Sequence, residues 1–189
     1  MSAKKSLAKI VGDISDLDTF IANDEYLTIV NQDPPKAFVK DHPMSSGVKY
    51  IPIDKVEMML TKIYQHWYVE VLREGQLLNS VYVAVRLHYK HPVSGQMEYQ
   101  DGVGAMQIQV DKGKDASELA AIKANAIMLA LPAAKSFAIK DAAEHIGKVF
   151  GRDLNRKDTL AFTPSYATIQ GKTIATKKKN IREKLNADN

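Results

Sequence analysis

The chain of 189 residues contains no cysteine, which excludes disulfide bonds and metal sites built from thiolates. It has no run of about 18 apolar residues, and no apolar segment follows the lysines near Met1. We therefore expect neither a membrane span nor a secretory signal, and we expect a cytoplasmic protein. With 45% hydrophobic and 25% charged residues, the composition is that of a globular protein with one main domain and appendages.

The sequence signatures of nucleotide and metal chemistry are incomplete. The segment GKT at 171–173 resembles the end of a phosphate-binding loop, but Tyr166 occupies the position where that loop requires glycine. The pair Gly102 and Gly104 is too short for a dinucleotide fingerprint, and a bulge or a close backbone approach explains it better. DKGKDASE lacks the glycine that a calcium loop has at its sixth position. We expect a protein that is not an enzyme and needs no cofactor.

Positive charge is concentrated at the C-terminal end. From Gly151 onward nine residues are basic and four are acidic, whereas the preceding part is close to neutral. A basic segment of this kind is the usual footprint of contact with a polyanion, and a solubilising end is the alternative. Few large apolar side chains occur in 156–189, so we predict a basic, flexible tail there.

Periodicity predicts helical structure before the centre of the chain. Residues 1–33 read as short helical pieces, with Ser15 or Asp16 as a cap. The proline-rich stretch NQDPPKAFVKDHPMSSG predicts a loop or an extended crossover. A helix is predicted from about 53 to 65, because four apolar residues share one helical face: Val56, Met59, Leu60 and Ile63.

The centre of the chain alternates with a period of two, which is typical of β-strands. Three segments show it: WYVEVL, SVYVAVRLHYK and GQMEYQDGVGAMQIQV. One face of the second segment is apolar and includes Tyr89, predicted to be buried, whereas the other carries Tyr82, predicted to be exposed. HPVSG predicts a hairpin turn, so the sheet is antiparallel and one of its faces needs cover.

Two helices are predicted to supply that cover. The first is DASELAAIKANAIMLAL, capped by Asp115 or Ser117 and ended by Pro132, and the second spans 133–155. At 100° per residue, the second helix has an apolar stripe formed by Ile139, Ala143, Ile146 and Phe150. Its opposite side carries a ladder of i+4 neighbours: Lys140, Glu144, Lys148 and Arg152. The order helix, strand meander, two helices predicts an α+β fold.

Four segments follow one another in an order that is more specific than any one of them. They are YIPIDKVEMML, VAVRLHY with Arg86 in mid-strand, QDGVGA, and AIKDAAEHIGKVFG. Together they resemble the annealing domain of the Rad fifty-two superfamily of single-strand annealing proteins, and most of all its phage and prophage recombinases. The resemblance covers about 107 of 189 residues, from Lys49 to about Asn155.

The resemblance implies a β-β-β-α annealase core that assembles as a homo-oligomer into a ring or an open helical arc. It implies binding of single-stranded DNA in a basic groove and ATP-independent annealing of complementary strands, through an annealed duplex intermediate, in homologous recombination. It places the protein at the nucleoid of a bacterial host, with a phage exonuclease or a host single-strand binding protein as further partners. The domains would be 1–33 for self-assembly, 34–155 for annealing, and 156–189 as the tail.

The resemblance also suggests which residues contact DNA. Lys49, Arg86 and Lys148 fall on basic groove positions of the family, and Lys135 and Lys140 lie earlier on the same predicted helix as Lys148. A tyrosine near the basic strand could stack on bases. With the remaining cations of the same strand and helix, the full expected set is Lys49, Arg86, Lys90, Lys135, Lys140, Lys148, Arg152 and Tyr82.

One departure from the family pattern and two alternatives stand beside this hypothesis. Glu144-His145 occupies the place of an adjacent basic pair in eukaryotic members, and a carboxylate there would repel phosphate. A DNA-end protection or mediator protein on the same fold is one alternative. A metal-dependent nuclease using residues of the central strands is the other: Asp101, Glu98 and His88. For His88 and His91, surface polar positions are predicted rather than metal ligation.

Overall fold

The computed structural model describes residues 17–43, 45–114 and 122–158. Its elements in chain order are α2 (Leu17–Val30), η1 (Lys36–Phe38), β1 (Lys40–Asp41), β2 (Lys49–Tyr50), α3 (Ile53–Ile63), β3 (Trp67–Leu77), β4 (Ser80–Lys90), β5 (Met97–Gln107), α4 (Ala126–Ile146) and η3 (Lys148–Phe150). Within the described residues, every helix is too short or too polar to span a bilayer.

The stretch from Val30 to Thr159 forms one compact unit. It contains all of these elements except α2, of which only the last residue, Val30, belongs to it. α2 confirms helical structure in the predicted N-terminal segment, but Ser15 and Asp16, its proposed caps, lie outside the described residues.

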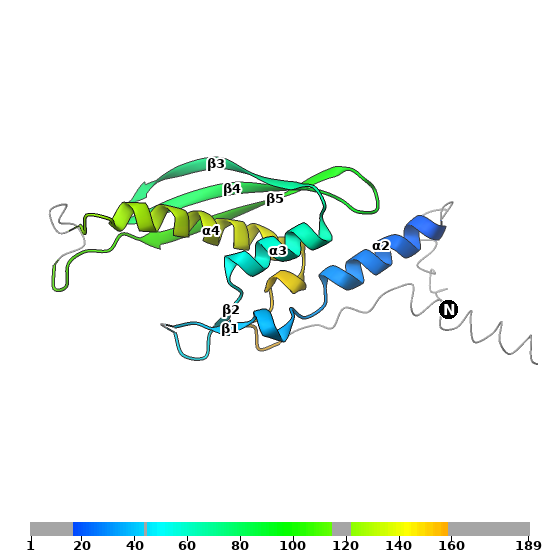
Figure 1. Cartoon of the computed structure of the whole chain (residues 1–189), viewed down its shortest axis with the longest axis horizontal. Helices are drawn as coiled ribbons and strands as arrows, with labels where there is room; N and C mark the ends of the chain where they lie inside the picture. The colour runs from blue at the N-terminus through cyan, green and yellow to red at the C-terminus, as the bar shows by residue number, and fades with distance from the viewer. Residues whose placement is uncertain (1–16, 44, 115–121, 159–189) are drawn as a thin grey trace, which may run out of the picture. The chain divides into compact units, whose positions relative to one another are not determined.

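A three-stranded antiparallel sheet in the order β3-β4-β5 is the centre of this unit, and α4 runs along one of its faces (Figure 1). The turn predicted at HPVSG joins β4 to β5, and their pairing runs without a shift from Ser80 opposite Gln107 to Lys90 opposite Met97. The pairing of β3 with β4 has one irregularity, between Val71 and Arg73. The predicted α+β fold, a strand meander covered by helices, is confirmed.

The apolar face of β4 is the middle of the core. Its buried residues alternate with half-buried ones, as the period of two predicts, and are 0–6% exposed: Val81, Val83, Val85, Leu87 and Tyr89. The ring of Tyr89 lies 4.6 Å from that of Tyr64, which follows α3. A slip of one residue in the register would turn all five side chains toward solvent, so burial of this face fixes the pairing.

α3 begins behind Pro52, which occupies the N-cap position, and ends at Ile63, two residues before the predicted end. It buries Val56, Met59 and Leu60, as predicted, while Ile63 is only half-buried. The preceding proline-rich stretch contains η1 and β1, and β1 pairs with β2 in a short antiparallel ribbon. This ribbon brings Lys49 and Tyr50 to the start of α3.

α4 is one helix of 21 residues that contains Pro132, so the predicted break at this proline is wrong. Proline removes the hydrogen bond that its N–H would make to the carbonyl of Met128. Met128 is 75% exposed, so water can reach this side of the helix and satisfy the carbonyl. The predicted start is also wrong for 122–125, because α4 begins after Asn125; Asp115 and Ser117 lie outside the described residues.

α4 approaches β5 closely because the facing residues are small. A methyl group on Gly102 or Gly104 would overlap backbone atoms of α4. The carboxylate of Asp141 also accepts a hydrogen bond of 3.0 Å from the amide of Val103, so the helix caps one amide of the strand. The close backbone approach predicted for the two glycines is confirmed, and the alanines that meet them are Ala134, Ala138 and Ala142.

The helix predicted over 133–155 ends at Ile146, because Gly147 is extended and lies against Val30. A methyl group on Gly147 would overlap the carbonyl oxygen of Val30, which makes this contact specific for glycine. The chain continues in η3, from which Phe150 is buried as predicted, although not on a helical stripe. The predicted ladder of i+4 charges is therefore interrupted after Glu144.

Candidate nucleic-acid interface

A hollow of about 340 Å³, which we call the basic hollow, lies between β2, α4 and the segment after η3. Its lining includes Lys49 from β2, Lys140 and Glu144 from α4, and Arg152 and Arg156 from the last segment. Four cations and one carboxylate give the hollow a net positive charge, which attracts polyanions.

The wall formed by the segment after η3 is held in place by side-chain amides. Asn155 accepts a hydrogen bond from the Lys49 backbone amide (2.8 Å) and donates one to the Lys49 carbonyl (2.9 Å). Arg152 donates a hydrogen bond of 2.9 Å to the side chain of Asn31. These bonds tie distant parts of the chain together and fix the backbone from which the exposed Lys49 side chain projects.

Lys140 is half-buried between two aromatic rings. Its Nζ lies 5.2 Å from the ring centroid of Tyr50 and 5.6 Å from that of Phe137. Both rings stabilise the ammonium group through their negative faces. Burial lowers the pKa of Lys140, and the carboxylate of Glu144 opposes this shift.

Glu144 stands where eukaryotic members of the family that the sequence resembles have a basic residue. It lines the same hollow one helical turn after Lys140. Burial raises the pKa of Glu144, while the charge of Lys140 opposes the rise. The carboxyl group consequently takes up a proton at a higher pH than an ordinary glutamate. Its repulsion of a phosphate weakens as it does so.

Lys148 is not part of the lining of the basic hollow. Its Nζ lies 2.7 Å from the carboxylate of Asp33, and its side chain is only 16% exposed. Gly147 and η3 turn this residue away from the direction that a continuous helix would give it. Asp33 therefore neutralises the cation that the resemblance places in the groove.

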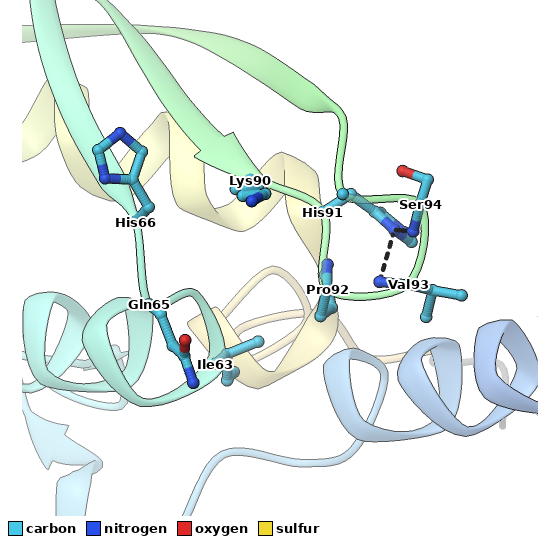
Figure 2. Close-up of a pocket in the computed structure, with 9 residues that line it drawn as sticks. Ile63, Gln65, His66, Lys90, His91, Pro92, Val93 and Ser94 are labelled. Atoms are coloured by element: carbon cyan, nitrogen blue, oxygen red, sulfur yellow. Dashed lines mark hydrogen bonds between the residues drawn. The ribbon is translucent and has the colours of Figure 1, made fainter.

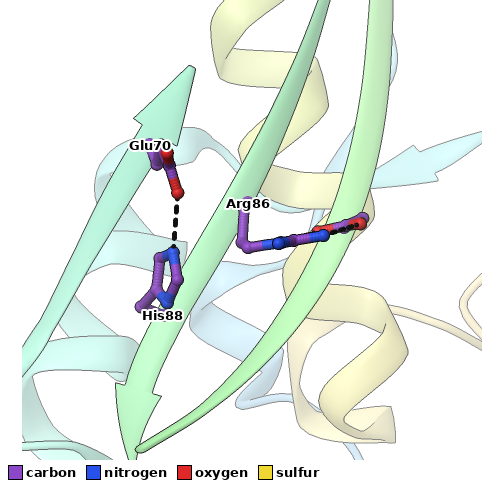
Figure 3. Close-up of polar contacts among 4 residues, drawn as sticks. Glu70, Arg86 and His88 are labelled. Atoms are coloured by element: carbon purple, nitrogen blue, oxygen red, sulfur yellow. Dashed lines mark hydrogen bonds and ion pairs between the residues drawn. The ribbon is translucent and has the colours of Figure 1, made fainter. Parts of the chain in front are cut away.

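Arg86 lies on the face of the sheet that α4 does not cover. Its guanidinium group makes two parallel hydrogen bonds, of 2.7 and 2.8 Å, to the carboxylate of Asp101 on β5 (Figure 3). It also lies 4.1 Å from the ring centroid of Tyr99. The pair raises the pKa of Arg86 and lowers the pKa of Asp101. A phosphate at Arg86 would have to compete with this bidentate carboxylate.

The same uncovered face carries a group of rings around His88. Tyr68 stacks on His88 with a centroid distance of 4.5 Å, and His88 Nε2 lies 3.1 Å from the carboxylate of Glu70 (Figure 3). Tyr82 is half-buried rather than exposed as predicted, because its ring lies against Gly75 on the neighbouring strand. Tyr82 thus packs on the sheet instead of projecting from it.

Lys90 is exposed at the end of β4 and lines a separate hollow of about 590 Å³ with His66 and His91 (Figure 2). The prediction that His91 is a surface residue is wrong, since it is 9% exposed. Its Nδ1 accepts hydrogen bonds from the amides of Val93 (3.3 Å) and Ser94 (3.2 Å). This imidazole therefore organises the turn between β4 and β5.

The structure thus brings together only part of the expected set. Three of the eight residues line the basic hollow: Lys49, Lys140 and Arg152. The others lie apart from it: Arg86 and Tyr82 on the uncovered sheet face, Lys90 beside the β4–β5 turn, Lys135 exposed on α4, and Lys148 against Asp33.

The three residues of the nuclease alternative are divided between the two faces of the sheet. Glu98 lies opposite Tyr89 on the face toward α4 and accepts a hydrogen bond of 3.2 Å from its hydroxyl. Asp101 and His88 lie on the other face. In the described part of the chain, no three His, Asp or Glu side chains are grouped as metal ligands.

Sequence reasoning missed several residues of the basic hollow and its surroundings. Arg156 was assigned to the tail, and Asn155 gave no signal because an isolated asparagine has no periodicity or charge. Tyr50 was considered only as part of the segment YIPIDKVEMML, and Phe137 was not singled out. The position of Tyr50 beside Lys140 depends on the β1–β2 ribbon. Its strands have only two residues each, which is too short for a periodic pattern in the sequence.

Comparison with known proteins adds no assignment to this geometry. No protein-family model matches the chain, and no curated protein matches it.

Proposed function

We propose that this protein binds single-stranded DNA and anneals complementary strands without nucleotide hydrolysis. The observation that supports this most directly is the basic hollow, in which Lys49, Lys140, Arg152 and Arg156 converge from three separate segments. The collinear resemblance to single-strand annealing proteins supports the same function independently of that geometry.

The chemistry of the hollow is that of phosphate binding. Lysine and arginine side chains neutralise backbone phosphates and release condensed counterions, which gives an affinity independent of sequence and strongly dependent on salt. Contacts of this kind hold the strand without reading its bases. Bases that are not read remain available to a second strand, and base pairing then supplies the free energy of annealing.

One hollow of about 340 Å³ holds only a short piece of a strand. Assembly of several copies into a ring or an arc would repeat the site along the DNA. Each further contact is then intramolecular and benefits from a high effective concentration. The proposed homo-oligomer therefore explains how a modest site can hold a long strand.

The test uses the two exposed cations of the hollow, which can be changed without disturbing the core. We expect Lys49→Gln/Arg156→Gln to weaken binding of a labelled oligothymidine in fluorescence anisotropy. Loss of two phosphate contacts should reduce the slope of log K against log salt by about 1.4, at about 0.7 per contact for single strands. The Arg156 side chain is 65% exposed, and its ion pair with Asp153 spans 3.6 Å, so little structure depends on it.

The matched control removes the same charge elsewhere. Lys62→Gln/Lys112→Gln changes two exposed lysines outside the hollow and should leave the salt slope unchanged. An unchanged slope in the hollow variant, or an equal change in the control, would overturn the assignment of the hollow.

Annealing is measured separately, with complementary oligonucleotides that carry a fluorophore and a quencher. We expect accelerated pairing without ATP or a divalent metal. Binding without acceleration would favour the mediator alternative, and shortened strands would favour a nuclease.

A further inference from the structure

A second hollow, of about 410 Å³, adjoins the basic hollow, and we call it the aromatic pocket. Its walls include the rings of Tyr50, Phe137 and His42, and Ser136 supplies a hydroxyl group. Tyr50 and Lys140 line both hollows, so the two sites share one wall. Neither the sequence motifs nor the basic hollow itself accounts for this pocket.

We propose that the aromatic pocket receives one nucleobase of the DNA strand whose phosphates lie in the basic hollow. This inference rests on the proposed function and adds a base-binding step to it. A nucleotide joins an anionic phosphate covalently to a flat base. The basic hollow offers cations for the phosphate, and the adjoining aromatic pocket offers rings for the base. Lys140 lies where the two meet.

The walls of the pocket place two aromatic rings beside one cation. Nζ of Lys140 lies between 5 and 6 Å from two ring centroids, at 5.2 Å from Tyr50 and 5.6 Å from Phe137. The ring of His42 meets that of Tyr50 edge to face at 5.7 Å, which holds this wall in position. The volume lies within the range of about 300–1,000 Å³ that is usual for small-ligand sites.

Exposure of the outer wall gives a base a way in. Phe137 is 41% exposed although it is a large apolar side chain, and it projects from the middle of α4. Stacking of a base would cover this ring, and every base has a flat face, so the pocket would accept all four with little preference. A captured base is withheld from pairing until it leaves the pocket.

Two variants test the pocket in different ways. Phe137→Ala removes one wall, and Ala133→Leu fills the pocket while leaving its rings and Lys140 in place. Each should weaken binding of oligothymidine about tenfold, the usual effect of losing one base–aromatic stack. Ala133→Leu should not weaken binding of an oligomer of abasic deoxyribose phosphates of the same length. Lys49→Gln/Arg156→Gln should weaken binding of both oligomers.

The control and the outcomes separate this inference from the proposed function. Tyr99→Ala removes an aromatic ring that is 54% exposed on the uncovered sheet face, and it should leave both affinities unchanged. Equal behaviour of both pocket variants and the unmodified protein toward oligothymidine would overturn the pocket but not the basic hollow. Absence of binding to either oligomer would overturn both.

Position is tested by photo-cross-linking of an oligonucleotide that contains 5-iododeoxyuridine, followed by peptide mass spectrometry. We expect the cross-link at Tyr50 or Phe137. A cross-link at Tyr68 or Tyr99 instead would place the bases on the uncovered sheet face and overturn the inference, while leaving DNA binding itself established.

Discussion

Replacement of Gly102 or Gly104 by alanine tests the contact that holds α4 on the sheet. A methyl group at Gly102 would overlap the carbonyl oxygen of Ala138 and the amide nitrogen of Ala142. At Gly104 it would overlap the corresponding atoms of Ala134 and Ala138. These are backbone atoms of one helix, so they cannot rotate away as the end of a side chain can, and α4 has to move as a unit.

The magnitude follows from two opposing effects. Overpacking of a tight contact costs about 1–3 kcal/mol, and displacement of a whole helix belongs at the upper end of that range. Alanine loses less conformational entropy than glycine on folding, which returns about 0.5–1 kcal/mol. We therefore expect each variant to lose about 2 kcal/mol of unfolding free energy. Because both substitutions require the same helix displacement, the double variant should lose less than the sum of the two.

Urea unfolding followed by the fluorescence of Trp67, the single tryptophan of the chain, measures these values. Val103→Ala is the matched control, since Val103 lies between the two glycines and is 61% exposed on the opposite face. Its cost should stay below about 1 kcal/mol, the span of strand propensities. Losses below about 0.5 kcal/mol for both glycine variants, or a loss in the control equal to theirs, would refute the close packing of α4 on β5.

Other predictions concern charge. Glu144→Gln should strengthen single-strand binding about two- to fivefold at neutral pH, the effect of removing a like-charge contact of about 0.5–1 kcal/mol; weaker binding in anisotropy titrations would contradict it. Burial raises the pKa of Glu144, so in the unmodified protein binding should strengthen as pH falls through that raised pKa, and this change should shrink in Glu144→Gln. The same sign applies to folding: urea midpoints should rise relative to Glu144→Gln as pH falls, because the folded state holds this proton more tightly. Arg86→Gln should weaken binding less than Arg156→Gln, since Asp101 already neutralises Arg86; a larger loss would place the strand on the uncovered sheet face.

The sheet was the most predictable part of the fold because its signal is local. The alternation in SVYVAVRLHYK predicts β4 and its buried face, and HPVSG predicts the turn to β5. α4 was harder, because proline at 132 is a strong local signal for a helix end. The packing of its alanines on Gly102 and Gly104 outweighs the single hydrogen bond lost at Pro132.

The site depends on contacts that sequence periodicity does not contain. Gly147 is extended and lies directly against Val30. The helix therefore ends before Lys148, whose side chain pairs with Asp33 instead of continuing the predicted ladder of charges. The alternation along β4 places Arg86 on the uncovered face, as the structure shows. That Asp101 lies opposite Arg86 follows only from the register of β4 and β5, which the alternation does not define. Of the predicted cations in the basic hollow, Lys49 is joined by the hydrogen bonds of Asn155 to the segment that carries Arg152.

The carboxyl group of Glu144 is compatible with phosphate binding for a physical reason. Burial disfavours the charged forms of both Glu144 and Lys140 in the DNA-free chain. A phosphate in the basic hollow would supply a further counter-charge to Lys140, which raises the pKa of the lysine. Its like charge would raise the pKa of Glu144 further. Binding would then be linked to proton uptake by Glu144. Four cations surround this one carboxyl group, so the net charge of the hollow stays positive. The carboxyl group changes only the pH at which the hollow binds phosphate best.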